Sequence, residues 1–205
     1  MINKKYKDLV IATRNKKKKE EITRLLGNFG MKVWSLADFR NIPLIEEDGV
    51  TFDENAVKKA TIAARLTGML ALADDSGLEV DALGGEPGIY SARYAGEDAS
   101  DQENNKKLLE KLKGVLFKKR IARYKCSIAL AEPDGNFKVV RGECFGLIGT
   151  APKGNNGFGY DPLFIIPNFS KTVAELSPKI KDRISHRGKA VYQAKRILAR
   201  HAERA

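Results

Sequence analysis

The stretch that most constrains the fold is Leu-Ala-Leu-Ala-Asp-Asp-Ser-Gly at residues 70–77. Its first four residues are apolar, which is typical of a buried strand. The apolar run stops at Asp74 and Asp75, so we expect the strand to leave the core there. Ligands bind at the carboxyl ends of strands in open α/β sheets, and two neighbouring carboxylates repel each other unless a cation lies beside them. The stretch therefore predicts a divalent-metal site, with a simple Asp-Ser-Gly turn as the alternative.

The segment before this strand alternates between strand and helix. Residues 8–13 and 31–35 have the apolar character of short strands. Between them, apolar side chains recur at helical spacing, and we expect that helix to end at Gly30. A second helix begins at Thr51, with Glu54 completing a capping box, and its alanines permit close packing against a sheet. This order predicts an α/β sheet with helices packed on it.

The second half of the chain predicts another helix and a hairpin. The helix begins at Ser100, and strand-like runs at 120–132 and 136–148 flank a Pro-Asp-Gly turn. We expect this helix and hairpin to form a second lobe at about residues 84–150. The length of 205 residues fits a single domain spanning residues 1–205.

The composition indicates the compartment in which we expect the protein. No apolar run approaches the length of a membrane span, and the N-terminus lacks the apolar segment of a secretory signal. The two cysteines, Cys126 and Cys144, lie in strand-like stretches without metal-type spacing. We expect both cysteines to be small buried residues whose thiols stay reduced in the cytoplasm. We expect the protein to have no membrane partner.

The net charge of +11 is unevenly distributed. Lysine and arginine are concentrated near both ends, whereas aspartate and glutamate dominate residues 46–103. The first predicted helix opens with Lys16, Lys17, Lys18 and Lys19. Because a helix N-terminus already carries partial positive charge, lysines and free backbone N–H groups there predict a bound anion such as a phosphate chain. The spacing is not that of a Walker A loop, and a solvated lysine run is the alternative.

A glycine-rich loop at residues 153–162 contains Phe158 and Tyr160. Glycine permits close backbone approach and rigid aromatic faces stack on flat rings, so this loop predicts a pocket for a planar group. His186 lies beside Arg187 at the start of the last predicted helix. There it can donate to a carbonyl or a phosphate, although a lone histidine is more often structural.

Six short motifs now stand in one order along the chain. They are Thr-Arg-Asn-Lys at 13–16, Glu-Glu at 46–47 before Thr-Phe-Asp-Glu-Asn-Ala at 51–56, Ala-Asp-Asp-Ser-Gly-Leu at 73–78, Pro-Gly-Ile-Tyr-Ser-Ala-Arg-Tyr at 87–94, Gly-Phe-Gly-Tyr-Asp-Pro at 157–162 and Ser-His-Arg-Gly at 185–188. Each motif alone is weak. In this order they closely resemble the inosine triphosphate pyrophosphatase family, which includes the dITP/XTP pyrophosphatases. The resemblance extends from about Leu9 to Leu198.

The resemblance implies an enzyme that hydrolyses non-standard purine nucleoside triphosphates, namely ITP, dITP and XTP, to the monophosphate and pyrophosphate. Such an enzyme cleanses the nucleotide pool. The resemblance also implies an α/β, two-lobed mixed-sheet fold with helices on the sheet and the active site in the cleft between the lobes. It implies Mg²⁺ as the cofactor and a homodimer in the cytoplasm, without a requirement for nucleic acid.

The resemblance assigns roles to matching residues. It implies that Asp75 is the catalytic general base and a metal ligand, that Glu47 is a second metal ligand, and that Asp74 assists in holding the metal. The residues implied to bind the triphosphate are Thr13, Arg14, Asn15, Lys16, Lys17, Lys18, Asn55, Lys59 and Ser76. The residues implied to form the base pocket and the remaining nucleotide contacts are Phe158, Gly159, Tyr160, Asp161, Lys181, His186 and Arg187.

The first phosphate loop departs from the family pattern, which often has glycines where this chain has Arg14 and Lys17. Which of the lysines 16–19 contacts phosphate is therefore open. Two other functions are also open: a nucleic-acid-binding protein, indicated by the net charge, and a pyrophosphatase with a different nucleotide preference. The first predicts a continuous basic stripe with interleaved aromatic residues, whereas here the aromatic residues gather in glycine-rich loops.

Overall fold

The computed structural model describes residues 6–39 and 42–202. Its strands are β1 (Asp8–Ile11), β2 (Lys32–Ser35), β3 (Leu70–Val80), β4 (Ile121–Ala131), β5 (Phe137–Ile148), β6 (Phe164–Ile166) and β7 (Lys171–Thr172). Its α-helices are α1 (Lys16–Leu26), α2 (Phe52–Thr67), α3 (Asp101–Lys111), α4 (Pro178–Ile184) and α5 (His186–Ala202). Short 3-10 helices occupy several connections, among them Gly88–Arg93.

The strands form one mixed sheet in the order β2-β1-β3-β4-β5-β6-β7. β1 pairs in parallel with both β2 and β3, whereas β6 is antiparallel to β5 and to β7. Parallel strands need a crossover connection between them. Helix α1 lies between β1 and β2 along the chain, and helix α2 lies between β2 and β3. The predicted α/β fold with a mixed sheet is confirmed.

The chain divides into two compact units. The first comprises the described parts of Met1–Asp75, Cys126–Gly142 and Arg187–Ala205, and the second comprises Ser76–Lys125 and Glu143–His186. β3, β4 and β5 each contribute residues to both units. The second unit therefore extends beyond the predicted segment 84–150 on both sides, and the β4–β5 hairpin is divided between the units.

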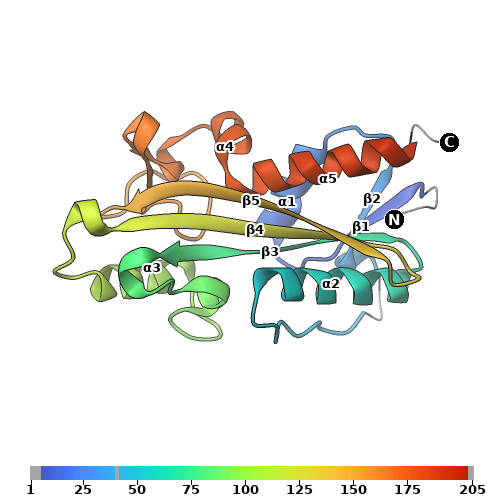
Figure 1. The fold of residues 1–205 in the computed structure, drawn as a ribbon, viewed down its shortest axis with the longest axis horizontal. Coiled ribbons are helices and arrows are strands. Elements are labelled where there is room, and N and C mark those ends of the chain that lie inside the picture. The colour runs from blue at the N-terminus through green and yellow to red at the C-terminus, as the bar shows by residue number, and fades with distance from the viewer. Residues whose placement is uncertain (1–5, 40–41, 203–205) are drawn as a thin grey trace. The chain divides into compact units, whose positions relative to one another are not determined.

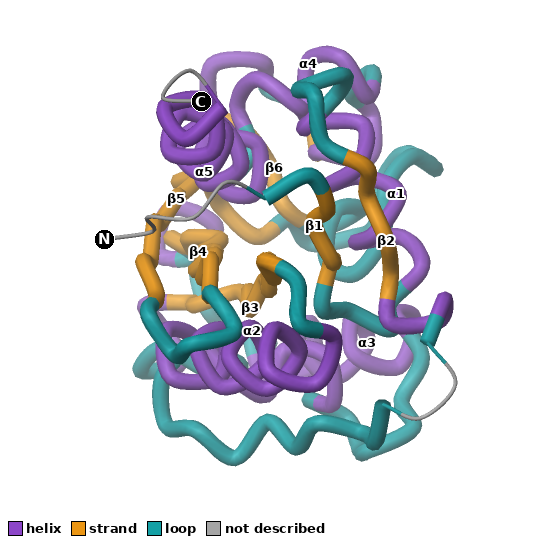
Figure 2. The backbone as a smooth tube through the Cα atoms, turned by 90° about the vertical axis from the view of Figure 1, so that its right-hand side faces the viewer, coloured by secondary structure: helices purple, strands orange, loops and turns teal. Residues whose placement is uncertain are grey.

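The first unit has three layers, because its strands bury apolar side chains on both faces. Large side chains lie on one face and small ones on the other. Figures 1 and 2 show α2 on one face of these strands and α5 on the other. The larger side chains pack with α1 and α5; they are Leu9, Ile11, Leu70, Leu72, Ile128 and Leu130. The smaller ones pack with the alanines of α2; they are Val10, Ala12, Ala71, Ala73, Ala129 and Ala131. Small residues on both sides of the second interface let α2 lie close to the sheet, as its alanines predicted.

β3 does not end at the two aspartates. The strand continues through Asp74 and Asp75 to Val80, and both carboxylates are buried within it. The prediction that the strand leaves the core at this point is wrong. Beyond the acids, Leu78 and Val80 are again fully buried, so the apolar pattern of the strand resumes in the core of the second unit.

Helix α1 also ends earlier than predicted. Gly27, with φ of 57°, follows its last residue, and its N–H donates to the carbonyl of Thr23. Gly30 lies outside the helix. A left-handed conformation is accessible to glycine at little cost, so the first glycine after the apolar stripe is the one that ends the helix.

The other predicted helix and turn signals are largely confirmed. Ser100 and Glu103 form a complete capping box at α3. At α2 the Thr51 side chain accepts from the Glu54 N–H, but the Glu54 carboxylate accepts from Val50 rather than from Thr51. The hairpin between β4 and β5 is present, with the Glu132 N–H donating to the carbonyl of Asn136.

The second unit has its own apolar core. Residues from β3, α3, β4, β5 and β6 meet there, including Leu78, Leu108, Leu112 and Phe164. Cys126 in the first unit and Cys144 in the second are free, buried thiols, as predicted. None of the helices in residues 6–39 and 42–202 is long and apolar enough to cross a membrane.

Candidate active site

Asp75 lies on the face of β3 that is covered by α2. Lys59 of α2 connects it to a second acid: the Lys59 Nζ lies 2.8 Å from Asp75 Oδ1 and 2.6 Å from Glu47 Oε1. Burial raises the pKa of the Asp75 carboxyl above its ordinary value, although Lys59 opposes the rise. Burial acts to lower the pKa of Lys59, but Asp75 and Glu47 outweigh it and raise that pKa. A charged lysine thus lies beside a carboxylate of increased basicity, which is a property of general bases.

Asn55 holds the loop that carries Glu47. This asparagine is 1 % exposed. Its Oδ1 accepts from the Gly49 N–H at 2.8 Å, and its Nδ2 donates to Asp75 Oδ2 at 3.4 Å. A Cβ on Gly49 would lie 2.8 Å from Asn55 Oδ1, so only glycine fits against this side chain. Asn55, which the resemblance assigns to the substrate, thus contacts both Asp75 and the loop that carries Glu47.

Asp74 lies on the opposite face of β3, towards α1 and α5. Its Oδ1 is 2.7 Å from Lys18 Nζ, and its Oδ2 accepts from Arg187 Nε at 3.2 Å and from the Cys126 thiol at 3.0 Å. Burial alone would raise the pKa of Asp74, but Arg187 and Lys18 hold it well below its ordinary value. Burial and Asp74 together raise the pKa of the Cys126 thiol, which therefore remains a donor.

Arg187 is completely enclosed in the first unit. It is 2 % exposed, and its Nη1 lies 2.8 Å from Glu21 Oε2. Burial acts to lower the pKa of Arg187, but Asp74 and Glu21 raise it above its ordinary value. Sequence reasoning assigned Arg187 to the substrate and missed Glu21. The signal was available, because Glu21 falls on the apolar stripe of α1 next to Ile22.

The N-terminus of α1 carries lysines and no acid in its first turn. The Asn15 side chain caps it by accepting from the Lys18 N–H at 3.0 Å. Lys16 and Lys17 are exposed, whereas the Lys18 ammonium reaches the buried Asp74. This geometry favours Lys18 among the four lysines as the residue held in a defined position.

The flanking residues of this loop have other contacts. The Thr13 hydroxyl accepts from the Asn15 N–H at 3.2 Å, and Arg14 Nη2 donates to the carbonyl of Ile42 at 2.9 Å. Ser76, which follows Asp75 in β3, is partly exposed. Arg14 therefore supports the loop after β2 in the structure.

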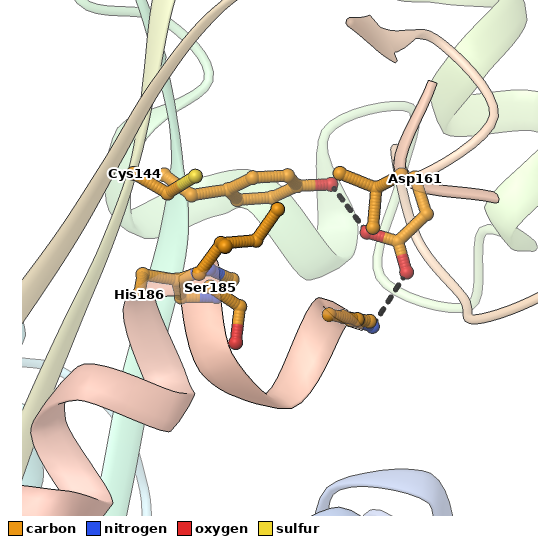
Figure 3. A pocket seen from close by; sticks show the side chains of 8 residues that line it. Cys144, Asp161, Ser185 and His186 are labelled. Carbon is orange, nitrogen blue, oxygen red and sulfur yellow. Dashed lines mark hydrogen bonds and ion pairs between the residues drawn. The ribbon is translucent and has the colours of Figure 1, made fainter. Parts of the chain in front are cut away.

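In the second unit, Asp161 organises the predicted base-pocket residues (Figure 3). Its Oδ2 lies 2.7 Å from Lys181 Nζ and accepts from the Phe158 N–H at 3.0 Å. The Tyr124 hydroxyl donates to its Oδ1 at 3.4 Å, and the Tyr124 ring stacks on His186 with centroids 4.5 Å apart. Asp161, Lys181, Tyr124 and His186 line a small pocket together with Cys144, Val173, Ile184 and Ser185. Sequence reasoning missed Tyr124, because its place in a strand gave no sign of this contact.

The two aromatic residues of the glycine-rich loop differ in exposure. Phe158 is partly exposed, and the Lys181 ammonium lies 4.8 Å from its ring centroid. Tyr160 is buried, and its hydroxyl donates to the carbonyl of Ser91 at 2.9 Å. Gly159 is held by Asn105, whose Nδ2 donates to the Gly159 carbonyl at 2.8 Å. Phe158 is thus the more exposed of the two rings, and Tyr160 anchors the loop.

Comparison with known proteins identifies the family. The model of the Ham1 family matches residues 9–197. The chain belongs to the Ham1 family. It is 52% identical over 183 residues to the dITP/XTP pyrophosphatase of Geobacter sulfurreducens, covering 89% of this chain and 92% of that protein. It is 54% identical over 192 residues to the enzyme of the same name from Desulforamulus reducens, covering 94% and 96%.

Solved structures agree with this membership. The HAM1 protein from Coxiella burnetii matches with a TM-score of 0.86 and 44% identity, over 94% of this chain and 98% of that one. The Staphylococcus aureus Ham1 protein matches with a TM-score of 0.84 and 43% identity, over 94% and 98%. The resemblance read from the six sequence motifs is therefore confirmed.

Glu47 and Asp75 of this Ham1 protein fit a Mg²⁺ site. Their carboxylate oxygens converge on the Lys59 ammonium, which a Mg²⁺ ion bound between them would displace, and oxygen is the ligand type that Mg²⁺ takes. Glu47 is exposed, so this position is open to solvent. Within the described residues, no group of three or more His, Cys, Asp or Glu side chains is arranged to hold a metal. Two protein carboxylates suffice where phosphate oxygens and water complete the coordination.

Asp74 does not fit the metal-ligand role that the sequence suggested. Its side chain is buried, and both of its oxygens already contact cations or a thiol. A Mg²⁺ ion there would have to displace Lys18 or Arg187. Asp74 and Arg187 are better described as counter-ions of each other.

Replacing Arg187 with methionine is expected to destabilise the protein by about 3–5 kcal/mol, because it leaves buried Glu21 and Asp74 without their shared cation. Urea unfolding followed by circular dichroism measures the change. Arg141→Met is the matched control, since Arg141 pairs with Asp53 at an exposed site and should cost about 0–1 kcal/mol. Similar small losses in both variants would contradict the structural role of Arg187.

Proposed function

We propose that this protein hydrolyses ITP, dITP and XTP to the monophosphate and pyrophosphate, removing deaminated purines from the nucleotide pool. The observation that carries the proposal is the arrangement of Asp75, Glu47 and Lys59: two acids, one of them buried, share one buried lysine. Membership of the Ham1 family and the names of the relatives support the same activity. Because its substrates are nucleotides of the cell, we place the enzyme in the cytoplasm.

In this proposal Asp75 orients the attacking water and accepts its proton. Its raised pKa suits a base, and Asn55 and Lys59 fix its two oxygens. Mg²⁺, held by Glu47 and Asp75, would neutralise charge that develops on the phosphate oxygens. Water then attacks the α-phosphorus and pyrophosphate leaves.

Residues of the first unit bind the phosphate chain in this proposal. The N-terminus of α1 offers backbone N–H groups and no acid in its first turn. Lys18 adds a cation whose position is set by Asp74. Lys59, which is buried between Asp75 and Glu47, is the second cation assigned to the phosphate oxygens. Thr13, Asn15 and Ser76 are assigned to this group by the resemblance.

Residues of the second unit bind the base in this proposal. The Phe158 ring stacks on the purine, and Lys181, which lies over that ring and pairs with Asp161, supplies a hydrogen-bond donor beside it. His186 is assigned to the remaining nucleotide contacts by the resemblance. A 6-keto oxygen accepts a hydrogen bond, whereas the 6-amino group of adenine would oppose a donor with another donor. Such a mismatch leaves a buried polar group unpaired and gives strong discrimination.

We also propose that the enzyme acts as a homodimer, as the family resemblance implies. Several large apolar side chains of the second unit are exposed, among them Leu116, Phe117 and Phe145. Exposed apolar side chains of this kind are compatible with a surface that a second copy covers.

Pyrophosphate release from ITP, dITP, XTP, GTP, ATP and dUTP tests the proposed function. With Mg²⁺ we expect release strongly favouring ITP, dITP and XTP, and with a chelator we expect none. Asp75→Asn should reduce release at least about a thousandfold while circular dichroism stays unchanged, because the general base and a metal ligand are both removed. Absence of release from every nucleotide would refute the activity, and equal release from all six would refute the selectivity.

Phe158→Ala should weaken binding of ITP more than binding of pyrophosphate, because only the nucleotide has a base to stack. We expect a loss of about 1–3 kcal/mol for the nucleotide. Isothermal titration with IMP, ITP and pyrophosphate measures both effects. Equal losses for ITP and pyrophosphate would move Phe158 out of the base pocket.

A further inference from the structure

Four charged side chains alternate in sign along one line of contacts in the first unit. Glu21 Oε2 contacts Arg187 Nη1 at 2.8 Å, and Arg187 Nε contacts Asp74 Oδ2 at 3.2 Å. Asp74 Oδ1 then contacts Lys18 Nζ at 2.7 Å. The first three side chains are at most 4 % exposed, whereas that of Lys18 is 18% exposed. The line therefore begins in the core and reaches solvent at the lysine.

We propose that Glu21 is a positioning residue for the triphosphate-binding lysine, Lys18, and that it acts through Arg187 and Asp74. The proposal rests on the proposed function only in assigning phosphate as the group that Lys18 binds. Glu21 does not touch the substrate in this account. It determines which atoms of Arg187 are available to Asp74.

The atoms used at each contact explain how this works. A guanidinium and a carboxylate prefer a bidentate pair that occupies both carboxylate oxygens. Here Glu21 contacts Nη1 of Arg187, and Nε of Arg187 donates to Oδ2 of Asp74. Oδ1 of Asp74 contacts Lys18. Glu21 thus fixes the orientation of the guanidinium; without it, Arg187 can turn, pair with both oxygens of Asp74 and displace Lys18.

Cys126 also helps to keep the two oxygens of Asp74 in contact with different partners. Its thiol donates to Oδ2, the oxygen that Arg187 also contacts, and leaves Oδ1 to the lysine. A buried ion pair adds little stability relative to apolar residues of the same volume. The presence of a charged residue, Glu21, on the apolar stripe of α1 is therefore better explained by the positioning of Lys18 than by stabilisation of the fold.

A double-mutant cycle tests the coupling between Glu21 and Lys18. Glu21→Gln alone should lower kcat/KM for ITP about tenfold, mainly through a higher KM, as expected for neighbouring residues that act together. In a Lys18→Met background the same change should have no further effect, because there is no lysine left to position. Glu20→Gln, on the exposed side of the same helix turn, is the control and should leave kcat/KM unchanged. A loss of equal size in both backgrounds would show that Glu21 acts only through the fold.

Chemical labelling of lysines tests the proposal without using enzyme activity. Reductive methylation followed by mass spectrometry should modify Lys18 several times more slowly than exposed Lys16 in the protein without a substitution, because the Lys18 side chain is only 18% exposed and its ammonium contacts Asp74. Glu21→Gln should raise the rate at Lys18 alone, and Glu20→Gln should not. An unchanged Lys18 rate in folded Glu21→Gln protein would overturn the positioning role.

The labelling result also separates this proposal from the proposed function. A faster Lys18 rate with no hydrolysis of any nucleotide would support the positioning of Lys18 and refute the enzymatic activity. If Glu21→Gln fails to fold, Glu21→Asp keeps the charge but shortens the side chain by one methylene. Lys18 of the Glu21→Asp protein should then be methylated faster than Lys18 of the protein without a substitution. Equal methylation rates would overturn the proposal.

Discussion

Two adjacent carboxylates can lie inside one strand of this protein because the alternation of β3 turns them to opposite faces of the sheet. Asp74 meets Lys18 and Arg187 on the side of α1 and α5, and Asp75 meets Lys59 on the side of α2. Each acid therefore has its own compensating cation, and no metal between them is needed to relieve their repulsion. The rest of the candidate site follows from this separation.

The separation gives the two acids different tasks. Asp74 is enclosed by cations and a thiol, which hold its pKa low and leave it as a fixed anion for Lys18. Asp75 has a raised pKa and shares its lysine with Glu47, an exposed acid that can meet a metal ion. In the proposed function, one acid thus supports the phosphate-binding lysine and the other takes part in the chemistry. The large Leu side chains and small Ala side chains of the same strand are distributed by the same alternation.

Local signals in the sequence predicted much of the fold, whereas the candidate site residues were assigned by the family resemblance. Capping residues, apolar spacing and turn residues depend on neighbours within a few positions, and Ser100 with Glu103 behaved as these rules require. The continuation of β3 through its acids was missed, because the compensating charges come from residues distant in sequence. For the same reason the contacts of Asn55 with Gly49 and Asp75, and of Arg187 with Glu21, emerged only from the structure.

Binding of Mn²⁺, followed by electron paramagnetic resonance, tests most directly whether the two acids differ in role. The account predicts that Asp75→Asn weakens Mn²⁺ binding by about tenfold or more, since it removes a ligand. Asp74→Asn protein that is folded by circular dichroism should bind Mn²⁺ within about threefold of the unmodified protein, because Asp74 contacts Lys18 and Arg187 instead. Equal losses in the two variants, or a greater loss for Asp74→Asn, would contradict the division of roles between the two carboxylates.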